Sequence, residues 1–331
     1  MESICRITSI PTGVDPFATG ATGRLRSGFS SHMARVLTTS HGLNRQAFSA
    51  TDWLLFASLS LIWGSSFLLM AIGLDSFHPG LVTLLRVGFG AGFMLLVPRA
   101  RNTRIDREDW PAVATVGLIW IAIPFTLFPI AQQWIASGVA GMLNGATPIF
   151  TAVVASVLLR ELPGTRQRVG LILGFGGIIA IALPSASTET TAAIGVILSV
   201  IATICYAFAS NIIAPLQQRY GSLPLMARMQ WVGLLLVIPY GAFGAASSTF
   251  SWASFTATAA VGVLGTGLGL VLMGSLIGSV GPTRATFITY IIPVVALVLG
   301  IVFRGEVISP IAIAGVALVI AGAAFASRRE I

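Results

Sequence analysis

Residues 148–161 read PIFTAVVASVLLRE, and residues 293–306 read PVVALVLGIVFRGE. Both stretches begin with proline and end with glutamate, and the second follows the first at an offset of 145 residues. Other residues keep the same offset: Gly117/Gly262, Ala140/Ala285, Val153/Val298, Val157/Val302, Gly170/Gly315, Leu173/Leu318 and Gly177/Gly322. Arg86 and Arg228 match at 142. The chain therefore contains an internal repeat, and this repeat decides the predicted fold.

The composition excludes an ordinary soluble protein. The 331 residues are 55% hydrophobic and 9% charged, with a mean hydropathy of +0.91. The net charge is +8, and all nineteen basic residues are arginine. These arginines fall between apolar stretches, as topology signals do, so we do not expect a nucleic-acid partner. Cys5 and Cys205 form neither a disulfide framework nor a metal motif.

Ten apolar spans follow one another from Trp53 onward. Most reach the roughly 20 residues that a helix needs to cross about 30 Å of hydrocarbon. Backbone polar groups in lipid must be satisfied within their own segment, so each span is predicted to be helical. The predicted spans are 53–73, 79–98, 111–131, 138–159, 167–184, 192–214, 223–245, 253–278, 282–303 and 310–327.

Each copy of the repeat holds five spans. Because five is an odd number, the second copy enters the bilayer from the opposite side, and the repeats are predicted to be inverted. Inverted repeats are the architecture of alternating-access transporters. The sequence therefore predicts an all-α membrane protein with ten transmembrane helices, which carries a small-molecule substrate across the lipid bilayer as a monomer or homodimer.

Four regions are predicted along the chain. They are a disordered basic cytosolic arm (1–50), a first five-helix repeat (51–184), a second, inverted repeat (190–327) and a basic tail (328–331). The composition of the arm also loosely resembles a transit peptide. Arginines gather in the even-numbered connections, which places both termini in the cytoplasm. We expect a multi-pass protein of the cell (inner or plasma) membrane.

Three segments resemble a known family. Residues 61–67 (LIWGSSF), followed by a span that opens near Pro79 and contains Arg86, are similar to the start of EamA-type members of the drug/metabolite transporter superfamily. Residues 138–161 resemble the fourth helix of that family, and residues 281–306 resemble the ninth. The resemblance covers residues 53–327. It implies ten helices in two inverted halves around a central cavity, and export of amino acids, metabolites or drugs.

Arg86 is a charged residue well inside a predicted span. It lies about 7 residues into the second span, roughly 10 Å deep at the helical rise. A charge within a bilayer costs at least about 2.5–3.5 kcal/mol, so it normally faces a cavity and has a partner. Arg86 either binds a substrate carboxylate or phosphate or gates the outer mouth, or it holds its helix against neighbouring carbonyls. Its repeat mate Arg228 is close enough to the interface to snorkel.

Carboxylates are absent from the interior of the predicted spans, which argues against a built-in proton relay. Glu161 and Glu306 lie at span ends, each near an arginine, Arg160 or Arg304. We expect these four residues to form gates or structural ion pairs.

A midplane binding site is predicted beside Pro148 and Pro293, because a proline within a helix leaves a carbonyl free. Aromatic and small polar residues near these prolines and in the first and sixth spans suit an amphipathic, amino-acid-like ligand. The alternative is kinked packing, with hydroxyls bonded back to their own helix. The candidate substrate-binding residues are Trp63, Ser65, Ser66, Arg86, Asn144, Thr147, Pro148, Tyr206, Asn211, Thr286, Thr289, Tyr290 and Pro293.

Catalytic motifs are missing from the sequence. None of the three histidines lies inside a predicted span, and neither a His-Glu-x-x-His nor a Gly-x-Ser-x-Gly pattern occurs. Without lysine, a Walker loop for ATP is impossible. We therefore predict no catalytic residue, metal site or cofactor. A channel or receptor is the alternative to a transporter, and an intramembrane enzyme is a more distant one.

Overall fold

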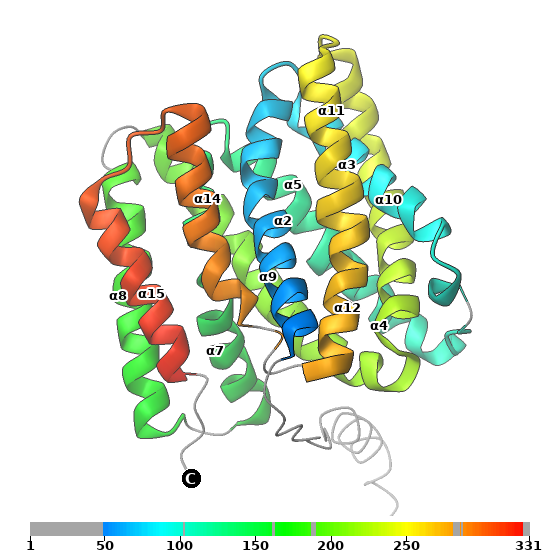
Figure 1. Cartoon of the computed structure of the whole chain (residues 1–331), viewed down its shortest axis with the longest axis horizontal. Coiled ribbons are helices and arrows are strands. Elements are labelled where there is room, and N and C mark those ends of the chain that lie inside the picture. The colour runs from blue at the N-terminus through cyan, green and yellow to red at the C-terminus, as the bar shows by residue number, and fades with distance from the viewer. Residues whose placement is uncertain are drawn as a thin grey trace, which may run out of the picture. The chain divides into compact units, whose positions relative to one another are not determined.

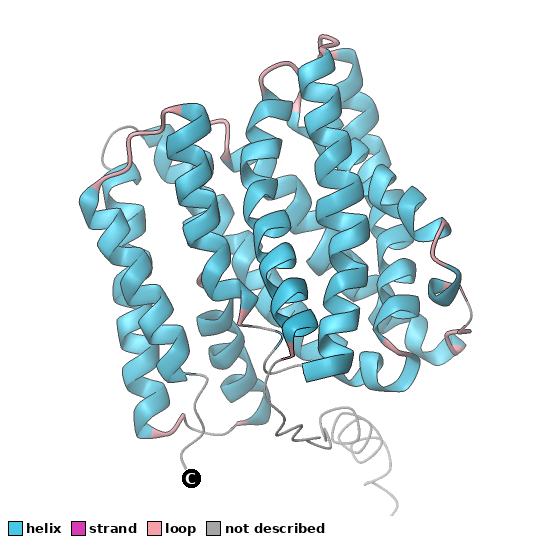
Figure 2. Cartoon of the chain, viewed as in Figure 1, coloured by secondary structure: helices cyan, strands magenta, loops and turns pink. Residues whose placement is uncertain are grey.

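Helices make up nearly all of the part of the chain that the structure describes. The computed structural model describes residues 49–101, 103–160, 163–186, 190–280, 285 and 287–326. All of them belong to the second of two contact units, residues 41–331. Figure 2 shows helices joined by loops, and no strand occurs among these residues. Glu161, Thr286, the tail at 328–331 and nearly all of the predicted arm lie outside the described residues.

The two halves of the chain contain a matching series of elements, and Figure 1 labels most of the longer helices. The first half contains α2 (Ala50–Leu74), α3 (Pro79–Leu95), η1 (Pro98–Ala100), η2 (Arg107–Asp109), α4 (Trp110–Val116), η3 (Gly117–Ala122), α5 (Ile123–Ala131), α6 (Ser137–Asn144), α7 (Thr147–Leu159) and α8 (Thr165–Ala186). The second half contains α9 (Thr190–Tyr220), α10 (Ser222–Ala246), α11 (Trp252–Ala260), η4 (Val261–Leu268), α12 (Gly269–Val280), α14 (Ile288–Arg304) and α15 (Pro310–Ala326).

Seven helical segments of the described chain are long and apolar enough to cross a membrane. They are Ala50–Leu74, Arg107–Ala131, Ser137–Leu158, Thr165–Pro184, Thr191–Tyr220, Ser222–Ala246 and Trp252–Ile277. Three shorter apolar helices, Pro79–Leu95, Ile288–Arg304 and Pro310–Phe325, correspond to the second, ninth and tenth predicted spans. The prediction of successive apolar helices is therefore confirmed for these segments.

The first helix begins earlier than its apolar pattern predicts. The Ser49 hydroxyl accepts a hydrogen bond from the Asp52 backbone amide at 3.2 Å, and the Asp52 carboxylate accepts one from the Ser49 amide at 2.9 Å. These two bonds form a capping box, which satisfies two amides of the first helical turn. Polar residues therefore extend this helix to Ala50, beyond the predicted start at residue 53.

The predicted fourth span is confirmed as the apolar helical segment Ser137–Leu158, which is interrupted by a short turn. It divides into α6 and α7, which are separated by Gly145 and Ala146, so Pro148 lies in the first turn of α7. Proline is well tolerated there, because the first-turn amides have no partner within the helix. Pro293, its repeat mate, does lie inside a helix, α14, which begins at Ile288. The predicted start of this span at residue 282 lies outside the described residues. The two prolines thus occupy different local structures.

Both halves contain a π-helical segment at the same repeat position. These segments are η3, which begins at Gly117, and η4, which contains Gly262. A methyl group placed on Gly117 would lie 3.1 Å from the Met229 carbonyl oxygen of α10, and one on Gly262 would lie 2.8 Å from the Arg86 carbonyl oxygen of α3. Each glycine therefore lets its helix approach the backbone of a helix from the other half.

The most extensive helix contacts join one half to the other. α8 packs on α15, α3 on α10, and α14 on both α2 and α6. α9 packs on α5 and α7, while η4 contacts α3 and η3 contacts α10. The largest cluster of buried apolar side chains likewise draws on both halves, with Phe67, Phe128 and Ile149 from the first and Val261 and Ile292 from the second.

Glycine pairs bring α8 and α15 into backbone contact, and Figure 1 shows the two helices side by side. A methyl group on Gly177 would lie 2.6 Å from the Gly315 carbonyl oxygen, and one on Gly322 would lie 2.6 Å from the Gly170 carbonyl oxygen. Early residues of α8 therefore meet late residues of α15, so the helices are antiparallel where they touch. Small residues allow such approach where lipid provides no hydrophobic drive for helix association.

We predict that Gly177→Ala destabilises the protein by about 1–3 kcal/mol, because the added methyl group overlaps the backbone of α15. Gly176→Ala is the matched control, since Gly176 lies in the same helix and has nothing within 4 Å of the added methyl position. Thermal unfolding of the purified protein in detergent measures both variants. Equal melting temperatures would contradict the proposed backbone contact.

Candidate functional site

Arg86 lies at a point where four elements meet. Its side chain comes from α3 and is only 7% exposed. Nε donates a hydrogen bond to Thr266 Oγ1 of η4 at 3.3 Å, and Nη1 donates one to Met70 Sδ of α2 at 3.0 Å. The guanidinium carbon lies 3.7 Å from the ring centroid of Phe125 in α5. The charge is thus enclosed by a hydroxyl, a thioether and an aromatic face.

Arg86 has no carboxylate partner among the described residues. Ion pairs in that part of the chain include those of Arg219 with Asp106 and Asp109, and of Arg304 with Asp75. A thioether sulfur is a weak acceptor, so the bonds of Arg86 satisfy its five donors poorly. Burial of an unpaired charge is costly. A guanidinium in this state is suited to bind an anion, and its planar fork matches a carboxylate.

Aromatic side chains form the apolar surroundings of this charge. Trp63 Nε1 donates a hydrogen bond to the Gly265 carbonyl oxygen of η4 at 2.8 Å, next to Thr266. Phe128 is stacked with Tyr206 of α9, with ring centroids 6.1 Å apart, and contacts Phe67 edge to face at 5.4 Å. The predicted residues Trp63, Arg86 and Tyr206 therefore share a region built around η4 and α5.

Three hydroxyl groups of the predicted site bond back to their own helix or turn, which is the alternative to ligand binding that the sequence left open. Ser65 and Ser66 both donate to the Ile62 carbonyl oxygen of their own helix, at 3.0 and 2.9 Å. Thr147 donates to the Asn144 carbonyl oxygen at 2.6 Å. These bonds stay within one helix or one turn, so the three hydroxyls do not point to a ligand as the structure stands.

A second group of predicted residues lies around the break between α6 and α7. A methyl group on Gly145 would overlap the Pro293 ring of α14, so the break packs directly on that helix. Asn144 is half-buried at the break, and its side chain forms no hydrogen bond with the described residues. Asn211 Nδ2 of α9 donates to the Ala207 and Thr151 carbonyl oxygens at 2.9 and 3.4 Å.

Two residues of the predicted site, Thr289 and Tyr290, lie in α14 shortly before Pro293. Tyr290 donates its hydroxyl to the Ala323 carbonyl oxygen of α15 at 3.1 Å, so it connects the last two helices of the second half. Thr289 precedes it in α14 and is half-buried. Both residues therefore belong to the α14 side of the break and not to the surroundings of Arg86.

Glu306 joins the two halves at one end of the helices. Its carboxylate accepts hydrogen bonds from the Ser137 amide at 2.7 Å, the Ser137 hydroxyl at 2.6 Å and the Gly138 amide at 2.8 Å. These groups form the N-terminus of α6, where a negative charge is stabilised by unpaired amides and the helix dipole. Arg304 forms its ion pair with Asp75 of the first half at 2.7 Å. Arg160 ends α7 in a left-handed conformation, with φ of 54°.

Sequence reasoning missed Met70, Phe125 and Thr266, the residues that enclose the charge of Arg86. Met70 and Phe125 are apolar side chains in apolar spans, so no pattern sets them apart. Thr266 has a weak signal, because it is a polar residue between Gly265 and Gly267 in the middle of a span. Gln230 of α10 is also fully buried, and its Nε2 donates to the Val87 carbonyl oxygen, next to Arg86 in α3, at 3.0 Å.

A separate cavity of about 430 Å³ lies near the start of α6. Its lining is mainly apolar and includes Trp134, Ile135, Ala136, Val139, Pro184, Ala192, Val307, Ile308, Ser309 and Ala312. None of the predicted site residues lines it. Because the convergent polar groups lie elsewhere, we centre the candidate site on Arg86.

The chain matches a family of membrane transporters. The model of the EamA-like transporter family matches it twice, at residues 52–183 and at residues 193–328. A relative from Streptantibioticus cattleyicolor, named "Probable terminal-alkyne amino-acid exporter", is 28% identical over 288 residues, which cover 86% of this chain and 95% of the relative. The "Uncharacterized inner membrane transporter YedA" of Escherichia coli (strain K12) is 30% identical over 270 residues, which cover 78% of this chain and 84% of the relative.

A solved crystal structure has a similar fold. It is 16% identical in sequence, covers 84% of this chain and 97% of its own, and superposes with a TM-score of 0.58. At this level of identity the likeness concerns the fold alone.

These findings define a multi-pass membrane protein of the transporter class. The chain belongs to the EamA-like transporter family, because the family model matches both halves and together these matches cover most of the sequence. The resemblance found in the sequence is confirmed. The family and the names of the relatives indicate a transporter with a small-molecule substrate rather than an enzyme.

We predict that Glu306→Ala destabilises the protein by about 1–3 kcal/mol, because it leaves the Ser137 and Gly138 amides without their acceptor. Glu108→Ala removes an exposed carboxylate and serves as the control. Chemical or thermal unfolding in detergent compares them. If the two variants are equally stable, the Glu306 contact makes no net contribution.

Proposed function

We propose that this protein exports a small amphipathic metabolite with a carboxylate, such as an amino-acid-like compound, by alternating access at a midplane site. One observation carries the substrate class: the guanidinium of Arg86 is buried without a carboxylate partner among the described residues. A substrate carboxylate would neutralise it. Trp63, Phe125 and Tyr206 would then contact the apolar part of the substrate.

The name of one relative supports this class of substrate. The protein from Streptantibioticus cattleyicolor is named as a probable exporter of a terminal-alkyne amino acid. An amino acid with an apolar side chain combines the two features that the Arg86 region is suited to recognise, a carboxylate and an apolar surface.

The packing of α8 on α15 supports an inverted repeat with ten crossings. The repeat offset of 145 residues makes Gly170 equivalent to Gly315 and Gly177 equivalent to Gly322. The contact between Gly170 and Gly322 is therefore equivalent to the contact between Gly315 and Gly177. Two equivalent helices that touch in this reciprocal way are related by a twofold axis. Since they are antiparallel, we place that axis across the helices, in the plane of the membrane.

Other helix contacts agree with the same twofold relation. The contact between α3 and η4 has its counterpart in the contact between α10 and η3. The contact of α2 with α14 likewise has its counterpart in the contact of α9 with α6 and α7. We propose that each half contains five helices and that the two halves move against each other around the midplane site, as the halves of inverted-repeat transporters do.

The predicted topology assigns a face to each end of the helices. With both termini in the cytoplasm, Asp75, Arg304 and Glu306 lie at the outer face. We propose that the Arg304–Asp75 ion pair and the contact of Glu306 with α6 hold the halves together there when the outer face is closed, and we call these two contacts the outer gate. Glu161 matches Glu306 by the repeat offset but lies outside the described residues.

We predict that Arg86→Gln lowers the flux of a carboxylate substrate by about 10- to 100-fold, the expected effect of losing a charge-assisted hydrogen bond. Flux of apolar amino acids into liposomes containing the purified protein measures this loss, and the matching amino-acid amides test the carboxylate itself. Arg228→Gln is the control, because the sequence aligns Arg228 with Arg86 and, within the described part of the chain, its guanidinium donates to the carbonyl oxygens of residues 100, 101 and 103. Equal losses in the two variants would argue against a substrate role for Arg86.

We also predict that Asn144→Ala and Tyr290→Phe abolish transport while membrane insertion stays intact. Asn144 ends α6 at the break, and Tyr290 lies three residues before Pro293, the residue of α14 that packs on Gly145. Ser156→Ala is the control, since Ser156 lies in α7 and bonds to its own helix. Flux in liposomes and the yield of inserted protein provide the two measurements. Unchanged flux would remove Asn144 and Tyr290 from the site.

A further inference from the structure

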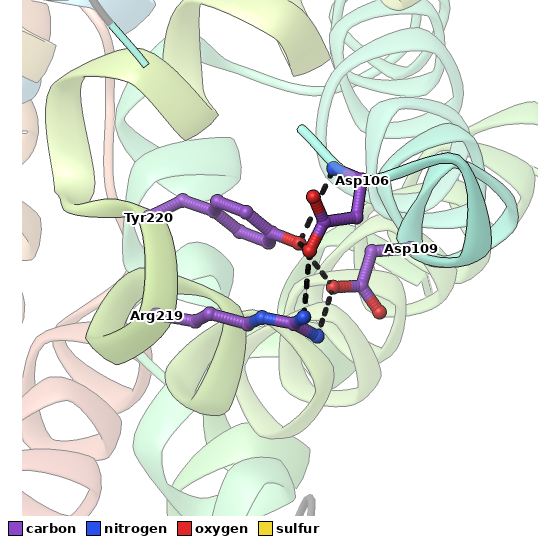
Figure 3. A network of polar contacts seen from close by, with 4 residues as sticks. All are labelled: Asp106, Asp109, Arg219 and Tyr220. Carbon is purple, nitrogen blue, oxygen red and sulfur yellow. Dashed lines mark hydrogen bonds and ion pairs between the residues drawn. The ribbon is translucent and has the colours of Figure 1, made fainter. Parts of the chain in front are cut away.

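A charged network joins the halves at the end of α9 (Figure 3). Arg219 contacts two carboxylates, with Nη1 2.6 Å from Asp109 Oδ2 and Nη2 2.6 Å from Asp106 Oδ2. The Tyr220 hydroxyl donates to Asp109 and accepts from the Asp106 amide at 3.3 Å. We call these four residues the α9 network. Its aspartates come from the first half, before α4, and its arginine and tyrosine come from the second.

An apolar layer lies directly behind the α9 network. It consists of Val113 and Val116 of α4, Ile213 and Leu216 of α9, and Leu225 of α10, all of which are at most 7% exposed. The ring of Tyr220 belongs to the same buried cluster, while its hydroxyl belongs to the network. A polar contact over a buried apolar layer excludes water from the space behind it.

The α9 network lies at the opposite end of the helices from the outer gate. Asp75 precedes α3, whereas Asp106 and Asp109 follow it, and the 17 residues of α3 span about 25 Å. In addition, Tyr220 follows Asp75 by 145 residues, the offset of the repeat. Asp75 and Tyr220 are therefore repeat mates that lie at opposite ends of the helices, one in each contact.

We propose that Asp106, Asp109, Arg219 and Tyr220 form the cytoplasmic gate of the transporter. This inference rests on the alternating access proposed above. When the gate is closed, the ion pairs hold the start of α4 against the end of α9. When the cytoplasmic side opens, Arg219 and Tyr220 separate from the two aspartates, and the apolar layer parts behind them.

The exposure of the α9 network suits a contact that opens and closes. The side chains of Arg219 and Asp106 are 55% and 59% exposed, so water and salt screen this pair. The Asp109 side chain is 20% exposed and Tyr220 is buried, so the inner part of the network contributes more. A contact of this kind shifts an equilibrium between two conformations by about fivefold, too little to lock one of them.

Distances between spin labels test the gate without any substrate. Glu108 and Gln218 are exposed and flank the network on its two sides, so cysteines at these positions report the cytoplasmic end. Cysteines at Gln133 and Val307, also exposed, report the outer end. Both pairs are introduced into the full chain carrying Cys5→Ser and Cys205→Ser, which is reconstituted in liposomes and measured by pulsed electron paramagnetic resonance.

We expect Arg219→Gln to raise the ratio of long to short distances in the Glu108–Gln218 pair by about fivefold, without lengthening the Gln133–Val307 distances. Arg304→Gln, the matched variant of the outer gate, should lengthen only the Gln133–Val307 distances. The exchange variant Arg219→Asp with Asp109→Arg should restore the short Glu108–Gln218 distance. Tyr220→Phe keeps the buried ring, so it replaces Arg219→Gln if that variant does not fold, and it should act in the same direction.

Two results would overturn the gate. One is an unchanged Glu108–Gln218 distance in Arg219→Gln and Tyr220→Phe while Arg304→Gln acts at its own end. The other is an equal lengthening of both pairs in Arg219→Gln, which would indicate general loosening. A single distance in both pairs for every variant would instead refute alternating access itself. Failure of the Arg86 flux experiment would leave these distances interpretable, because they require no ligand.

Discussion

Close backbone contact between the two halves is the constraint on which the rest of the structure depends. Lipid offers no hydrophobic drive for helix association, so packing must come from surfaces that fit closely. Gly177 and Gly315 provide such a surface between α8 and α15, and Gly117 and Gly262 provide it where the π-helical segments cross α10 and α3. Each of these contacts joins one half to the other, so the halves are held by one another more than by their own helices.

The π-helical segments connect this packing to the candidate site. A π-helix widens the turn, so some carbonyl and side-chain positions no longer match the regular helix, and such segments are frequent at functional sites. In η4, the Gly265 carbonyl oxygen accepts the indole N–H of Trp63, and Thr266 accepts Nε of Arg86. The same segment that allows α3 to approach through Gly262 therefore also positions the aromatic and the charged residue of the site.

The sequence predicts the helices well because each is a local property of an apolar stretch. It predicts that Arg86 matters for a similar reason, since one charge in an apolar stretch is visible without any partner. It does not reveal the partners. Met70, Thr266 and Phe125 come from three elements, two of them at other points of the first half and one in the second, and the repeat offset carries no information on which side chains meet.

The features at helix ends that the sequence did not predict also depend on contact partners that an apolar pattern does not reveal. The extension of α2 to Ala50 depends on the Ser49–Asp52 capping box, which an apolar pattern does not contain. Glu306 lies near Arg304 in sequence, which predicts an ion pair, yet its hydrogen bonds go to Ser137 and Gly138 in the other half. Neighbours along the chain were thus a poor guide wherever the contact is between halves.

Arg86 and Arg228 differ in their surroundings, and the proposed twofold architecture with a single site accommodates this difference. The sequence aligns the two arginines at an offset of 142 residues, but Arg228 is half-buried and donates to the backbone carbonyl oxygens of residues 100, 101 and 103. Arg86 is enclosed by η4, α2 and α5, with a thioether where a stronger acceptor would be expected. The helix contacts described above agree with the proposed twofold relation. The buried charge does not follow it, because a second buried guanidinium would add its own desolvation cost and repel the first. A substrate site in such a protein is therefore expected on one side of the twofold axis, beside the half whose arginine remains buried.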